Sequence, residues 1–189
     1  MKRFVHALIA VVALAMPVAA AEIGDDGLHK AAWMRDTFKD LHEDLAEGKR
    51  LVVMVEQRGC IYCQKMHEQV YSDPELPQFV GENFFVVQMN LHGSDTAIDF
   101  DGEELEQSAL MRKWGILFTP SVIFFPEDVP SDTPAPQVAV AIMPGSVTQS
   151  QLLTASLGVH EKRYLIDNGE DFQRYHARRI SERNNGNAD

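Results

Sequence analysis

The sequence predicts an α/β domain with one mixed central β-sheet flanked by helices. Three short, continuous, β-prone apolar runs occupy residues 51–55, 84–89 and 121–125. Such runs are typical of strands that are buried on both faces. Helical segments separate these runs, which predicts parallel pairing of the early strands. A fourth run at residues 138–143 follows after a short proline-rich loop and predicts an antiparallel hairpin with the third.

Apolar residues at helical spacing predict the first helix, from Leu28 to about Glu47. Its apolar stripe would consist of Met34, Phe38, Leu41 and Leu45, and Gly48 would end it. The next helix is expected over residues 60–71, followed by a short helical turn at 74–80.

Three further helices are expected in the second half of the chain. One follows Gly102 and ends near Gly115. The pair Thr148 and Gln151 has the spacing of a capping box, which predicts a helix that ends near Gly158. A polar helix is expected over residues 170–182.

The first 21 residues have the pattern of a secretory signal peptide. Lys2 and Arg3 precede an apolar run at residues 7–16, and small residues follow up to Ala21. The apolar run is about half as long as a bilayer span requires, so no stable membrane insertion is expected. We therefore predict export to the periplasm, a folded domain over residues 22–183 and a disordered tail over 184–189.

The formal net charge of the 189 residues is −11 at pH 7. A strongly acidic protein is repelled by the phosphates of nucleic acids and by anionic membranes. The charge balance therefore argues against both as partners, and no nucleic acid is expected to bind.

Cys60 and Cys63 are the only cysteines in the chain, and three interpretations of the pair are open. As a structural staple, the pair would close a loop of about four residues and contribute roughly 2 kcal/mol, against about 3 for fifteen residues. As a zinc site, it would lack two of the four usual ligands. Met66 and His67 could complete a copper(I) site instead, because copper(I) accepts soft thiolate and thioether ligands.

A redox pair fits the surrounding sequence best. A strand ending at Val55 and a turn through Gly59 would place Cys60 at the start of a helix. Unpaired N–H groups and the helix dipole stabilise a thiolate there. Cys63 would lie one turn later, where it can resolve a mixed disulfide.

These residues resemble the thioredoxin-fold family. The matching parts are the strand that leads through Gly59 into Cys60 and Cys63, and the segment from Trp114 to Ser121. The resemblance implies that Cys60 is the exposed nucleophile and Cys63 the buried resolving thiol. It also implies a cis peptide bond between Thr119 and Pro120, which would present Thr119 to an extended peptide substrate. No bound cofactor and no metal are expected, because the disulfide itself carries the electrons.

Two groups within this family resemble the chain further. The helix that begins at Cys60 is similar to the active-site helix of the periplasmic disulfide isomerases. Over a longer stretch, the chain resembles SoxW, the periplasmic thioredoxin of bacterial sulfur-oxidation clusters. This second resemblance implies a reductase of protein disulfides, with a membrane thiol carrier as electron donor and a sulfur-carrier protein as a partner. The shared features are Glu56-Gln57, Asp99 to Gly102, Trp114, Phe118 to Pro120, Tyr164, Phe172 and Tyr175.

The sequence departs from thioredoxins at Met54. Thioredoxins carry a buried acid six residues before the first cysteine, and this acid helps to deprotonate the second thiol. Glu56 lies two residues further along the same strand and therefore on the same face. We predict Glu56 as a substitute proton acceptor. Its alternative role is that of a structural acid.

The sequence therefore indicates an exported thiol–disulfide oxidoreductase, most simply a reductase. One alternative is an isomerase or an oxidant of the same fold. The other is a copper(I)-binding chaperone that uses Cys60 and Cys63 with Met66 or His67.

Overall fold

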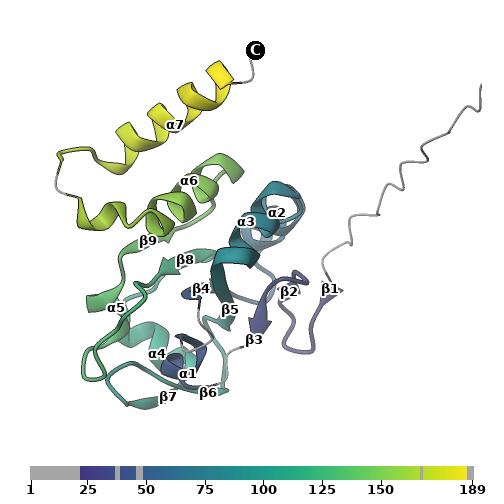
Figure 1. Ribbon diagram of the computed structural model, residues 1–189. Coiled ribbons are helices and arrows are strands. Elements are labelled where there is room, and N and C mark those ends of the chain that lie inside the picture. Colours follow the sequence, from purple (N-terminus) through teal and green to yellow (C-terminus); the bar gives the residue numbers. More distant parts are fainter. Residues whose placement is uncertain (1–21, 37–38, 46–48, 167, 187–189) are drawn as a thin grey trace, which may run out of the picture.

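The computed structural model describes residues 22–36, 39–45, 49–166 and 168–186. The predicted signal peptide lies outside these residues. A five-stranded mixed sheet forms the centre of the molecule (Figure 1). In spatial order its strands are β3 (Arg35–Asp36), β5 (Phe84–Asn90), β4 (Arg50–Glu56), β8 (Ser121–Phe124) and β9 (Ala141–Pro144).

The central strand β4 pairs in parallel with β5 and antiparallel with β8. The predicted mixed sheet and the antiparallel pairing of β8 with β9 are confirmed. The expectation that all three early strands run parallel is wrong for β8. The connection from β5 includes a small hairpin, β6 (Thr96–Ile98) and β7 (Glu104–Glu106), before α4 (Gln107–Lys113). It returns the chain to the edge where β4 ends, so β8 starts with Ser121 opposite Val55.

Helices cover both faces of the sheet, and strand alternation divides the core between them. Val52 and Met54 pack on the face that is covered by α2 (Ile61–Gln69), α3 (Glu75–Asn83) and α6 (Gln149–His160). Val53 and Val55 pack on the opposite face. That face is covered by α1 (Leu41–Leu45), α4 and α5 (Ala135–Val138). None of the helices in the described parts of the chain combines the length and the apolar character needed to cross a bilayer.

The predicted long helix from Leu28 to Glu47 is wrong. Residues 22–30 form a small hairpin of β1 (Glu22–Ile23) and β2 (His29–Lys30), and only Leu41–Leu45 is helical there. β3 pairs with the edge of β5, and this backbone pairing overrides the local helical spacing. Leu28 and Met34 are nevertheless buried. Phe38 and Gly48 lie outside the described residues.

The predicted capping box is present at the start of α6. The Thr148 hydroxyl accepts a hydrogen bond from the Gln151 amide, and the Gln151 side chain accepts one from the Thr148 amide. After α6, a short 3₁₀ helix, η1 (Arg163–Leu165), leads to α7 (Phe172–Gly186). α7 extends beyond the predicted helix of residues 170–182 and includes residues 184–186 of the predicted disordered tail. Residues 187–189 lie outside the described part of the chain.

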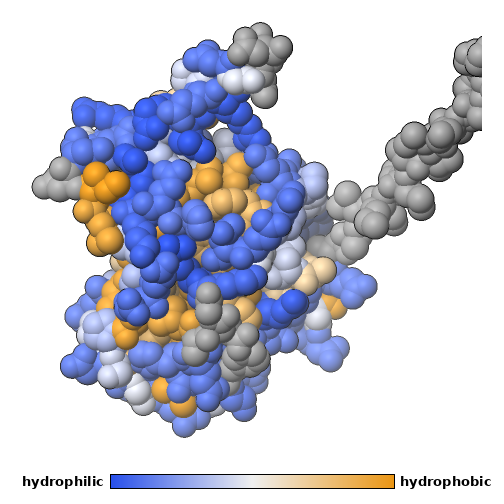
Figure 2. Space-filling model, in the orientation of Figure 1, coloured by the Kyte–Doolittle hydropathy of each residue, from blue (hydrophilic) through white to orange (hydrophobic). Residues whose placement is uncertain are grey.

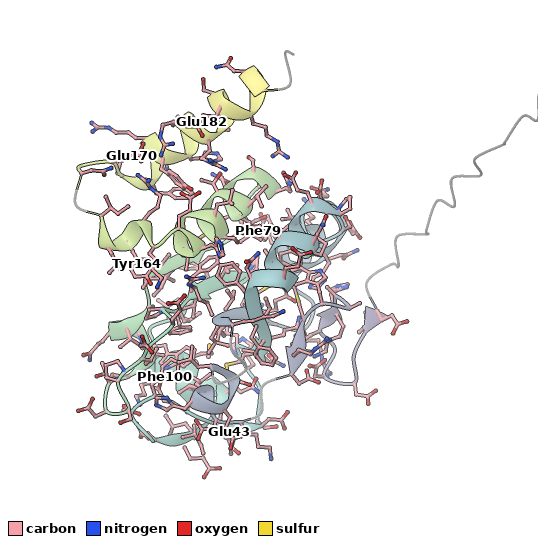
Figure 3. The ribbon with its side chains drawn as sticks, viewed as in Figure 1. Glu43, Phe79, Phe100, Tyr164, Glu170 and Glu182 are labelled. Carbon is pink, nitrogen blue, oxygen red and sulfur yellow. A yellow bond between two sulfur atoms is a disulfide. The ribbon has the colours of Figure 1, made fainter. Side chains whose placement is uncertain are left out.

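α7 lies outside α6, on the side away from the sheet (Figure 1). Glu170 binds both Arg163 and Arg178, while Glu182 binds Arg178. Figure 3 labels Glu170 near the start of α7 and Glu182 further along it. Tyr175, on α7, is buried against α6. The surface of α7 is largely hydrophilic, and an apolar patch adjoins the η1–α7 connection (Figure 2). Tyr164, Leu165 and Ile166 are exposed in this connection.

The docking of α7 is expected to depend on pH through Tyr175. Burial, with the negative charge of Glu161, raises the pKa of Tyr175 to about 12. The folded pKa exceeds the ordinary value of about 10, so the neutral Tyr175 side chain contributes its full stabilisation of the fold below pH 10. It is lost as the pH rises through about 12. The ultraviolet absorbance of tyrosinate, measured as wild type minus Tyr175→Phe, should titrate near pH 12. A difference that titrates at pH 10 would contradict this docking.

Candidate active site

Cys60 and Cys63 lie where strand β4 passes into helix α2, and their sulfurs form a disulfide. Gly59 has a φ of +71°, a conformation that favours glycine and that reverses the chain between the two elements. Cys60 is the N-cap of α2, and its sulfur accepts a hydrogen bond of 3.0 Å from the Cys63 amide. The predicted position of Cys60 at a helix N-terminus is confirmed. This position stabilises negative charge on its sulfur.

The two cysteines differ in their access to solvent. Cys60 is 8% exposed, whereas Cys63 is completely buried. In the reduced protein, only the Cys60 sulfur could therefore meet a disulfide from outside. Cys63 can reach Cys60 from below, which is the geometry of an attacking and a resolving thiol.

The Thr119–Pro120 segment lies beside the disulfide. The peptide bond between these residues is cis, as the family resemblance implies. The Thr119 hydroxyl donates a hydrogen bond of 3.4 Å to the Cys60 sulfur. Proline at the entry to β8 costs no sheet hydrogen bond and places neither a donor nor a charge beside the sulfurs.

Exposed apolar side chains stand next to Cys60 and next to Thr119, whose hydroxyl contacts the Cys60 sulfur. Ile61 and Tyr62 follow it at the start of α2, and Leu117 and Phe118 precede Thr119. Each of these four side chains is between 54% and 73% exposed. We call Ile61, Tyr62, Leu117 and Phe118 the apolar rim. Grouped apolar residues at a surface indicate a binding site for another molecule.

Glu56 lies on the Met54 face of β4, as strand alternation predicts, and it is buried against helix α2. Its carboxylate oxygens lie 3.0 and 3.1 Å from His67 Nε2. One of them also accepts a hydrogen bond of 2.9 Å from the Gln88 side chain. The side chains of Glu56 and His67 are each only 1% exposed. The structure therefore joins Glu56 to His67, a partner that the sequence analysis did not assign to it.

Tyr71 completes this buried group. Its ring packs edge-on against His67, at 4.9 Å between ring centroids. Burial, together with the negative charge of Glu56, raises the pKa of Tyr71 well above its usual range. The phenol therefore remains neutral at physiological pH.

The surroundings of Met66 and His67 do not favour the copper site. Met66 is buried, and its sulfur accepts a hydrogen bond of 3.4 Å from the Val147 amide. The Nε2 atom of His67 faces Glu56. In the described residues, no three histidine, cysteine, aspartate or glutamate side chains are grouped so that they could hold a metal ion.

Comparison with known proteins agrees with this geometry. The family model of the thioredoxin-like domain matches residues 37–131. A thioredoxin-fold protein from Helicobacter pylori is 15% identical, with 85% of this chain and 94% of that chain covered and a TM-score of 0.56. A thioredoxin from Thermus thermophilus is 21% identical, with 67% of this chain and 85% of that chain covered and a TM-score of 0.52. The search of curated proteins gave no match.

The structural neighbours are similar in fold, and the family model covers half of the chain, including both cysteines and Thr119-Pro120. A disulfide at a helix N-terminus, with one accessible sulfur, is the chemical centre that thiol–disulfide exchange requires. The chain belongs to the thioredoxin-like domain family and is a thiol–disulfide oxidoreductase with a Cys60–Cys63 pair.

Proposed function

We propose that this protein is an exported reductase of protein disulfides, similar to the SoxW type. The observation that carries the proposal is the set of groups around Cys60. Its sulfur receives hydrogen bonds from the Cys63 amide and the Thr119 hydroxyl, which are both neutral donors. The guanidinium of the nearby Arg58 instead donates to the Asp26 carbonyl. Neutral donors stabilise a thiolate less than a cation does, so the pair is a weaker oxidant than one with a charged neighbour.

The reaction is a two-step exchange that needs no bound cofactor. The Cys60 thiolate attacks a sulfur of the substrate disulfide, and one substrate thiolate leaves as a mixed disulfide forms. The Cys63 sulfur then attacks Cys60, which re-forms the Cys60–Cys63 bond and releases the second substrate thiolate. The substrate gains two electrons and the protein loses two. A membrane thiol carrier would reduce the pair again in the periplasm, and a sulfur-carrier protein is the expected substrate.

The reduction potential separates this proposal from an oxidant of the same fold. We expect equilibration with a glutathione buffer to give a value of about −220 mV or lower, in the range from glutaredoxins to thioredoxin. A value near −120 mV, about that of the strongest oxidant of the fold, would contradict the reductase role.

The signal peptide needs a separate test, because processing after Ala20 or Ala21 should be visible in the mass of the exported protein.

The apolar rim is expected to bind the chain of a protein substrate. Replacing both Leu117 and Phe118 with serine should raise KM for a protein disulfide at least about tenfold, because burial of even one apolar side chain contributes on the order of 1.5 kcal/mol. The rate with a small aromatic disulfide should not change. The matched control is Leu165→Ser with Ile166→Ser, which removes exposed apolar side chains in the η1–α7 connection. Equal loss in both double variants would contradict a specific rim.

A further inference from the structure

His67 has a buried ring nitrogen that lacks a hydrogen-bond partner. Nε2 faces the Glu56 carboxylate, while Nδ1 makes no hydrogen bond within the described structure. A carboxylate accepts hydrogen bonds, so in the neutral imidazole it favours the tautomer with hydrogen on Nε2, which leaves a lone pair on Nδ1. An unpaired buried polar atom destabilises a fold by about 1–3 kcal/mol. Such an atom beside an active site therefore needs an explanation.

The position of His67 relative to Cys63 offers an explanation for its unpaired nitrogen. Cys63 and His67 are four residues apart on the buried face of α2, a spacing that places their Cβ atoms about 5–6 Å apart. Helical side chains lean toward the N-terminal end, a preference that directs the His67 side chain toward the turn that contains Cys63. Transfer of a proton over this span requires direct contact or one water molecule. Met54 lies on the same face of β4 as Glu56, the face that α2 covers, but its side chain has no group that accepts a proton.

We propose that His67 Nδ1 is the proton acceptor for the Cys63 thiol, and that Glu56 is a positioning residue. The inference rests on the exchange reaction proposed above. In the mixed disulfide, the Cys63 proton passes to Nδ1 and the thiolate attacks the Cys60 sulfur. The bond between Cys60 and the substrate breaks, and its electron pair leaves on the substrate thiolate. The resulting imidazolium is paired with the Glu56 carboxylate, and no further reactant is needed.

A cavity gives the proton a route to solvent. It has a volume of about 900 Å³ and lies between the β1–β2 hairpin and helices α2 and α3, and His67 lines it. His29, on β2, is half-buried with its ring centroid 5.6 Å from that of His67. Water in the cavity can take the proton from the imidazolium. The titratable side chains that line this cavity together with His67 are Glu22, His29, Lys30, Glu68 and Tyr71, and Glu56 faces His67 from β4.

The test separates the two chemical steps within one experiment. Reduced protein is mixed with an excess of an aromatic disulfide that releases a coloured thiolate. The first equivalent reports the attack by Cys60, and the second reports the resolution by Cys63. For His67→Gln at pH 7, we expect an unchanged first phase and a second phase slowed about 100-fold, the usual effect of a lost general base. Between pH 6 and pH 8, the slowed phase should rise about tenfold per pH unit, because the fraction of an unassisted thiol that is thiolate rises tenfold per pH unit below the ordinary thiol pKa of about 8.5.

Three comparisons make the outcome specific. Glu56→Gln should slow the second phase as well, and the double variant should be no slower than the worse single variant, because both residues act on one proton. His176→Gln, a histidine that binds Thr154 on α6, is the matched control and should leave both phases unchanged. In His67→Ala, imidazole should restore the second phase, whereas the much less basic pyrazole should not. This last variant also distinguishes a proton-transfer role from a structural one.

The outcomes that overturn the inference are distinct from those that overturn the exchange reaction. A normal second phase in His67→Gln, or slowing by Glu56→Gln alone, would remove His67 as the acceptor. Equal rescue by imidazole and pyrazole would assign His67 a structural role. Absence of the first phase in the wild-type protein would instead contradict the proposed exchange.

Discussion

Replacement of Cys63 with serine is expected to turn the protein from a catalyst into a trap. Cys60 would still attack a substrate disulfide, but the mixed disulfide would have no resolving thiol. Turnover should fall by more than about 10³-fold, because one of two groups that act as a unit is missing. Mass spectrometry of periplasmic extracts under non-reducing conditions should find Cys60 joined to a partner protein, and that partner would be the substrate.

The reverse variant is the control for this trap. Cys60→Ser also lacks the disulfide, but it leaves only the fully buried Cys63 sulfur. It should form no mixed disulfide and show no turnover. Equal trapping by both variants would contradict the assignment of Cys60 as the accessible nucleophile.

Replacement of Asp99 with alanine is expected to produce the largest loss of stability. Asp99 is completely buried, and its carboxylate accepts hydrogen bonds from Trp114 Nε1 at 3.0 Å and from the Ala135 amide at 2.9 Å. It also pairs with Lys113 at 2.9 Å. The variant would leave buried donors without a partner, which typically costs about 3–5 kcal/mol. Urea unfolding should show this as a lower midpoint.

Asp101→Ala is the matched control for Asp99. Asp101 binds the same Lys113, but its side chain is 22% exposed. Lys113 also holds the pKa of Asp101 below its usual value. Solvent screens this pair, so its loss should reduce stability by less than about 1 kcal/mol. Similar losses of stability for Asp99→Ala and Asp101→Ala would contradict the view that the buried hydrogen bonds of Asp99 stabilise the fold more than the exposed pair of Asp101 and Lys113.

The sequence predicted the sheet well where burial alone determines the pattern. β4, β5 and β8 are continuous apolar runs because helices cover both of their faces. The first helix was predicted wrongly because its apolar spacing arises from separate strands and turns. β3 depends on pairing with the edge of β5, and no local pattern reports such a distant contact.

The same contrast between local patterns and distant contacts explains which residues of the site could be predicted. Cys60, Cys63 and Pro120 stand in short motifs, so their types and spacing were sufficient to find them. The Glu56–His67 pair required the packing of α2 on β4, which joins two residues of different elements. A signal did exist, since His67 shares the buried face of Cys63 and Glu56 shares the face of Met54. The sequence could not show that the two faces meet.

The central claim is that Cys60 and Cys63 together pass two electrons to a protein disulfide. The most direct test mixes the fully reduced wild-type protein with an equal amount of a disulfide-bonded protein, then quenches with acid and counts thiols on each partner. We predict that the protein loses two thiols, both from the Cys60–Cys63 pair, as the substrate gains two. A reduced protein that keeps both thiols, or a substrate that gains none, would contradict the account.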